Sequence, residues 1–101
     1  MTQYLVGETK TVTLAFVDEA GTPSNPDTIS LKISLDNGNG TATTLATLNK
    51  ADLDNPAIGS YEKTYTFAQE GKYVFDVVTT GTPKTRILET VAVIEPYTYT
   101  P

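Results

Sequence analysis

The sequence contains neither cysteine nor histidine among its 101 residues. Without cysteine the chain forms no disulfide and has no thiol chemistry. Without histidine it lacks the commonest general base and the commonest metal ligand, and no serine has a histidine to activate it. The twelve acidic residues show no arrangement that pairs two of them for catalysis. We therefore expect no enzymatic activity and no cofactor.

Long hydrophobic runs are also missing, so we expect no membrane-spanning segment. The first eight residues have no basic segment and no apolar core, which argues against a secretory signal and for synthesis in the cytoplasm. Basic residues are scarce, with seven Lys and Arg against twelve Asp and Glu and a net charge of -5. Because nucleic-acid binding requires clustered positive charge, we expect no nucleic-acid partner.

What the chain does contain is short runs of alternating apolar and polar residues, rich in Thr, Val, Ile, Leu, Tyr and Phe. This period of two indicates half-buried β-strands. Residues 50–56 are predicted as a loop with room for one helical turn. The predicted strands are residues 4–6, 10–18, 27–36, 41–49, 59–67, 72–79 and 85–94. About seven short strands without a long helix predict an all-β sandwich or barrel.

Two of these strands carry more specific predictions. Residues 72–79 follow a turn at Gly71 and alternate cleanly, so we predict that they form the central strand. Residues 85–94 are apolar on both faces. We predict a β-bulge around Glu89 and Thr90, because a bulge would let the strand change the face that it buries.

The segment from Gln69 to Phe75 resembles the immunoglobulin-fold signature Asp-x-Gly-x-Tyr-x-Cys. The resemblance places Tyr73 at the tyrosine corner and Phe75 at the second cysteine, with Phe16 at the first cysteine and Leu31 at the core tryptophan. It implies an immunoglobulin-like β-sandwich of about seven strands without a disulfide. A disulfide contributes about 2–4 kcal/mol and a buried Phe roughly 1.5–3 kcal/mol, so Phe16 packed on Phe75 would offset the missing bond.

Nearly the whole chain resembles short immunoglobulin-like proteins encoded among the virion genes of tailed bacteriophages. The similar features are Tyr-x-Val-Gly-Glu near the start, the Phe-x-Asp-x-x-Gly-x-Pro loop at 16–23, the Pro-Asp-x-x-x-Leu-x-Ile strand at 26–33, and Gly-x-Tyr at 59–61 and 71–73. The resemblance implies a virion structural protein of the capsid decoration, neck or tail accessory type. It also implies several copies in a particle, bound to major capsid, neck or tail proteins.

The end of the chain differs in composition from the rest. We assign residues 1–95 to the sandwich domain and 96–101 to an extended C-terminal tail, in which Tyr and Thr alternate between two prolines. Tyrosine suits interfaces because it buries apolar area and keeps a polar group. We therefore predict Tyr97 and Tyr99, together with Tyr4, as interface residues, with the tail docked on the sheet edge of a neighbouring subunit.

Three alternatives differ from this interpretation. The first is an adhesion module for host glycan or surface protein, which solvent-facing aromatic residues clustered at one loop end would favour. A second alternative is a bacterial cell-surface immunoglobulin-like repeat from a longer chain. The third alternative is a calcium-binding site. Its oxygen ligands would come from Asp52, Asp54 and Asn55 or from a cluster at residues 36, 37 and 39. Because such residues are common in ordinary turns, we predict turns and no metal site.

Overall fold

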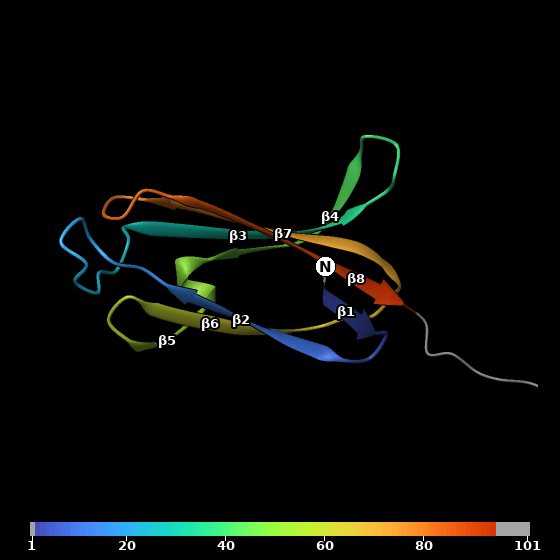
Figure 1. Ribbon diagram of the computed structural model, residues 1–101, viewed down its shortest axis with the longest axis horizontal. Coiled ribbons are helices and arrows are strands. Elements are labelled where there is room, and N and C mark those ends of the chain that lie inside the picture. The colour runs from blue at the N-terminus through green and yellow to red at the C-terminus, as the bar shows by residue number, and fades with distance from the viewer. Residues whose placement is uncertain (1, 95–101) are drawn as a thin grey trace, which may run out of the picture.

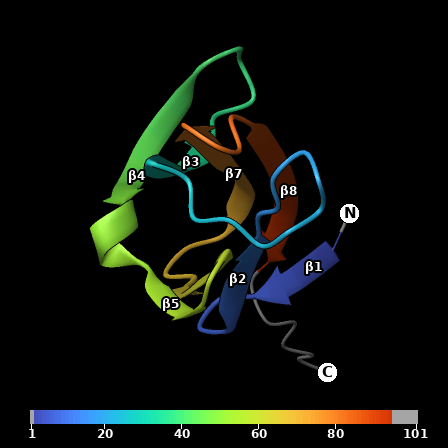
Figure 2. The same cartoon turned by 90° about the vertical axis from the view of Figure 1, so that its left-hand side faces the viewer.

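The computed structural model describes residues 2–94, which form two β-sheets packed face to face (Figure 1). The strands of the larger sheet follow the order β1-β8-β7-β3-β4, and those of the smaller sheet β2-β6-β5. Seen from one end, β3, β7 and β8 lie on one side of the core and β2 lies on the other (Figure 2). The elements are β1 (Thr2–Leu5), β2 (Thr9–Ala15), β3 (Thr28–Asp36), β4 (Ala42–Asn49), the 3-10 turn η1 (Lys50–Asp52), β5 (Asp54–Ala57), β6 (Ser60–Thr66), β7 (Gly71–Thr80) and β8 (Arg86–Ile94).

This architecture confirms the predicted all-β, immunoglobulin-like β-sandwich without a disulfide. The described residues form eight strands, one more than predicted, because β5 lies in a stretch predicted as loop and pairs with β6. Strand β7 is the middle strand of the larger sheet and pairs antiparallel with β3 on one side and β8 on the other. The predicted central strand is therefore confirmed.

The core is made from the inward-facing residues of both sheets, as strand alternation requires. The four residues that the sequence assigned to the core are each no more than 3% exposed, which confirms that assignment. Aromatic rings from β6 and β7 form a cluster around Phe67, the residue that follows β6. The centroid of the Phe67 ring lies 4.9 Å from that of Tyr73 and 6.3 Å from that of Phe75. The buried hydrophobic residues are Val12, Leu14, Phe16, Ile29, Leu31, Ile33, Leu53, Tyr61, Phe67, Tyr73, Phe75, Val77, Val91 and Val93.

The predicted tyrosine corner is present at the start of β7. The Tyr73 hydroxyl donates a hydrogen bond to the Gln69 carbonyl oxygen over 2.7 Å, which ties the strand to the turn before it. Burial raises the pKa of Tyr73 above its ordinary value, because the phenolate would lose its hydration inside the core. The resemblance to the immunoglobulin signature is thus borne out in geometry at Tyr73.

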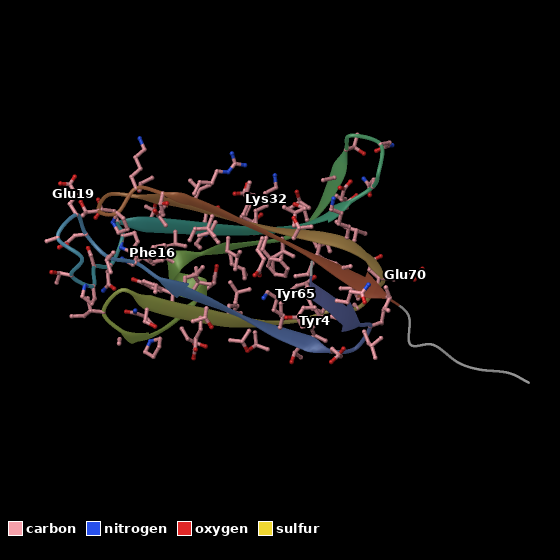
Figure 3. The ribbon with its side chains drawn as sticks, in the orientation of Figure 1. Tyr4, Phe16, Glu19, Lys32, Tyr65 and Glu70 are labelled. Atoms are coloured by element: carbon pink, nitrogen blue, oxygen red, sulfur yellow. The ribbon has the colours of Figure 1, made fainter. Side chains whose placement is uncertain are left out.

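The predicted packing of Phe16 on Phe75 is wrong. The ring of Phe16 lies 6.0 Å from that of Tyr61, whereas Phe75 contacts Tyr65 and Phe67. Phe16 follows the last residue of β2 and therefore sits near one end of the sandwich, away from the Tyr65 cluster (Figure 3). No ring pair joins Phe16 to Phe75 among the described residues, and the cavity beside Phe75 is lined from β2 by earlier residues of that strand.

The predicted bulge at Glu89 and Thr90 is also wrong. The pairing of β7 with β8 keeps one register from Gly71–Val93 to Val78–Arg86, so β8 does not change face. Glu89 consequently points into the space between the sheets, where its carboxylate meets the Lys10 ammonium at 2.8 Å. The ion pair offsets the cost of placing a charged side chain on the inward face of β8. Because the register is unbroken, the apolar residues on the other side of β8 stay on the outer face.

Candidate interaction surface

Strand β8 has a neighbour along only part of its outer edge. Strand β1 pairs with it in parallel, but the pairing runs only from Thr2–Val91 to Leu5–Ile94 (Figure 1). Over residues 86–90, β8 has β7 on one side, and no strand in the described range 2–94 lies on the other. We call residues 86–90 the open half of β8 and residues 91–94 its covered half.

An open strand edge presents N–H and C=O groups that can pair with another chain. Natural proteins protect such edges with charges, prolines or bulges. The open half of β8 has charged side chains at Arg86 and Glu89 but keeps an unbroken register and contains no proline. Its backbone is therefore suited to accept a strand from a partner.

Exposed apolar side chains lie on the outer face of the same region. Leu5, Val78, Leu88 and Ile94 are between 39% and 58% exposed. The register places Leu5 opposite Ile94, Leu88 opposite Asp76, and Val78 opposite Arg86. Alternation puts the partly buried Val74 and Ala92 on this face between them. We call these residues the outer stripe: Leu5, Val74, Val78, Leu88, Ala92 and Ile94.

A fixed ion pair interrupts the outer stripe. The Arg86 guanidinium donates two hydrogen bonds to the Asp76 carboxylate, Nε to Oδ1 at 3.0 Å and Nη2 to Oδ2 at 2.9 Å. Hydrogen bonding to Asp76 raises the pKa of Arg86, so the guanidinium stays charged. Arginine is enriched in protein–protein interfaces relative to the rest of the surface, and contact with a partner would remove the exposed aliphatic side chains beside it from water.

The three predicted interface residues fall in different places. Tyr97 and Tyr99 lie outside the described residues. Tyr4 is half-buried on β1 and faces the core, with its ring 5.1 Å from that of Phe67 and the Lys10 ammonium 5.9 Å above it (Figure 3). Tyr4 therefore closes the covered half of β8 from inside, and its role in an interface stays a prediction.

The oxygen-rich segments form hydrogen-bonded turns. The Asp52 carboxylate accepts from the Asn49 N–H at 2.8 Å, and Asp36 accepts from the Gly38 N–H at 2.8 Å. The Asn55 amide donates to two backbone carbonyl oxygens at 2.7 Å. Across residues 2–94, acidic side chains do not gather in threes as they would around a metal ion. These side chains thus have the turn roles that such residues commonly take.

The outer stripe was not recognised from the sequence, although its signal is visible there. Leu88, Ala92 and Ile94 alternate with Ile87, Val91 and Val93, so β8 is apolar on both faces. A strand with two apolar faces is either buried on both sides or exposes one of them. Here the second face has no covering layer within residues 2–94, and Leu88 and Ile94 are exposed.

No protein-family model matches the chain, and no curated protein matches it. Within the part of the chain that the structure describes, no helix is long and apolar enough to cross a membrane.

Proposed function

We propose that the chain is a non-enzymatic structural subunit of a tailed-phage particle. It would act as a capsid decoration or a neck or tail accessory protein, present in several copies. It binds other virion proteins through the open half of β8 and the outer stripe beside it.

The observation that carries this proposal is the exposure of Leu88, which is 58% exposed in the open half of β8. A large apolar side chain at an unpaired strand edge favours a protein partner, because contact removes apolar area from water and pairs the free backbone groups. Val78 and the Arg86–Asp76 pair extend this surface across β7. The assignment to a virion is supported by the resemblance of the loop and strand motifs described above.

Aromatic side chains exposed at one loop end would favour the adhesion alternative. Within residues 2–94, every Phe and Tyr side chain is buried or half-buried. The adhesion alternative therefore lacks this support within residues 2–94, and we favour the structural role.

Particle composition tests the proposal. Intact particles of the phage that encodes the chain are purified on a density gradient, and its copy number relative to the major capsid protein is measured by quantitative mass spectrometry. We expect a fixed ratio that persists after high-salt washing. Loss of the chain from intact particles would contradict the proposal.

Two variants then test the surface. Leu88→Arg places a charge in the outer stripe and should lower the bound copy number by at least about tenfold, since an interface hot spot contributes about 2 kcal/mol or more. Ile58→Arg is the matched control, because Ile58 is 68% exposed in the turn between β5 and β6, away from β8. An equal loss of bound copies for both variants would show that the outer stripe is not part of the contact.

A further inference from the structure

A groove runs along the free edge of β2, on the side where β8 is open. Its cavity volume is about 240 Å³. Five consecutive β2 residues, 10–14, line it, so it follows the strand edge rather than one face of the strand. From the other sheet it is lined by Phe75, Val77, Ile87 and Glu89. The Lys10–Glu89 ion pair spans the two sheets at one end of the groove.

The fold leaves room for one more strand at this position. Sandwiches of the immunoglobulin constant type have a four-stranded sheet A-B-E-D. Here β2, β6 and β5 take the places of B, E and D, while the first strand, β1, lies in the other sheet beside β8. Among the described strands none pairs with the free edge of β2. An extended segment laid along this edge would pair its backbone with β2 and point alternate side chains between the sheets.

We infer that the groove binds the C-terminal tail, residues 95–101, of a second copy of this chain. Tyr97 and Tyr99 are two positions apart, so in an extended strand both rings point to the same side, about 7 Å from each other. An apolar cavity of about 150 Å³ accepts one benzene-sized ring, so 240 Å³ is enough space for a tyrosine ring. The apolar residues of the lining suit the ring, and the Lys10–Glu89 pair offers hydrogen-bond partners to its hydroxyl.

Length prevents the chain's own tail from placing both tyrosines in the groove, because Tyr97 is too close to Ile94. The groove starts at the level of Glu89, which is five strand positions, or roughly 17 Å, before Ile94. Tyr97 is three residues after Ile94 and reaches at most about 11 Å from it, even fully extended. The tail of a second copy has no such limit. Its four residues between Pro96 and Pro101 span about 13 Å, close to the five-residue length of the groove.

The setting of this inference, a multi-copy particle, rests on the proposed function, but its residues differ from the outer stripe. Because each copy offers one tail and one groove, the contact is head-to-tail and joins copies into a ring or a chain. The test uses the purified full-length chain alone. Its failure would leave particle binding through the outer stripe untouched.

Disulfide trapping tests the contact directly, since the chain has no cysteine of its own. If Tyr97 and Tyr99 point inward, Thr98 points outward beside the exposed Thr11 or Thr13 of β2. Thr98→Cys protein is mixed with Thr11→Cys or with Thr13→Cys protein under mild oxidation, and the mixed dimer is quantified by mass spectrometry. The matched control replaces Thr13→Cys with Thr44→Cys on β4, at the opposite edge of the molecule.

We expect about tenfold more mixed dimer from at least one β2 variant than from the Thr44→Cys control, because docking raises the effective concentration of the two thiols. The Tyr97→Ala/Tyr99→Ala change, added to the Thr98→Cys chain, should return the yield to the control level, whereas adding Thr100→Ala should not. Control-level yield from both β2 variants, or a yield that survives loss of both tyrosines, would overturn the inference.

Discussion

The two halves of β8 share one partner, β7, and one uninterrupted register, yet they differ in burial. Val91 in the covered half is 1% exposed, whereas Ile87 in the open half is 38% exposed, although both face inward. The difference is the strand on the other side, because β1 and the Tyr4 ring close only the covered half. Burial along this strand is thus decided by what lies across its edge as well as by alternation.

The largest expected effect is on stability, and it compares the halves directly. Val91→Ala should lower the free energy of unfolding by about 2 kcal/mol, because it removes fully buried methyl groups and leaves a cavity. Ile87→Ala removes a larger side chain from a half-open site and should cost about 1 kcal/mol or less. Urea unfolding followed by circular dichroism measures both. An Ile87→Ala cost above that of Val91→Ala would show that the open half is closed in solution.

Loosening β1 should make the covered half resemble the open half. Tyr4→Ala removes the ring that packs on Phe67 and should cost about 1–2 kcal/mol. Amide hydrogen exchange should then speed up over residues 91–94 and change little over 86–90. Gln3→Ala is the matched control, since Gln3 is exposed on the same strand. Unchanged exchange over residues 91–94 would mean that β1 does not protect them.

A change in the shared partner should affect both halves alike. Tyr73→Phe removes the hydrogen bond to Gln69 at the start of β7 and should cost about 1 kcal/mol at neutral pH. Burial raises the pKa of Tyr73, so its contribution is present below the ordinary value of 10.0 and is lost as pH rises through the raised pKa. The variant should therefore lose stability less steeply above pH 10 than the original chain. A steeper loss of stability above pH 10 in the variant than in the original chain would contradict a raised pKa for Tyr73.

The smallest expected effect concerns the ion pair beside the open half. Glu89→Gln should cost about 0.5 kcal/mol at neutral pH, because Glu89 is half exposed and solvent screens the pair. Burial lowers the pKa of Lys10, but the hydrogen bond and charge of Glu89 outweigh it and raise the pKa overall. The contribution is thus complete below 10.5 and disappears as pH rises through the raised pKa. Urea unfolding at increasing alkaline pH measures the difference in stability between the two proteins. If the difference persists above the pH at which Lys10 loses its proton, the ion pair is not its cause.

The sequence predicted the parts of the fold that depend on alternation and on local turn chemistry. Tyr73, Phe75 and Leu31 were placed in the core correctly, and β7 was correctly predicted as the central strand. The β5 strand was missed because its residues, Asp-Asn-Pro-Ala, have poor strand propensity and pair only through β6. Tertiary pairing, which no local pattern encodes, decided its structure.

The interaction surface was harder to predict for a related reason. Alternation shows that Leu88 and Ile87 lie on opposite faces, but it does not show which strand covers an edge. We interpreted the two apolar faces of residues 85–94 as a bulge, because a single buried face is the commoner arrangement. The unbroken register of β8 and the short β1 together expose Leu88, and both are properties of strand pairing over long sequence distances.

Hydrogen exchange of the chain in its free and particle-bound forms tests the proposal that virion proteins bind the open half of β8 and the outer stripe. We predict that amides over residues 86–90 become protected on binding, while those of β4, at the opposite edge of the sheet, exchange as before. Protection confined to β4, with residues 86–90 unchanged, would contradict the account.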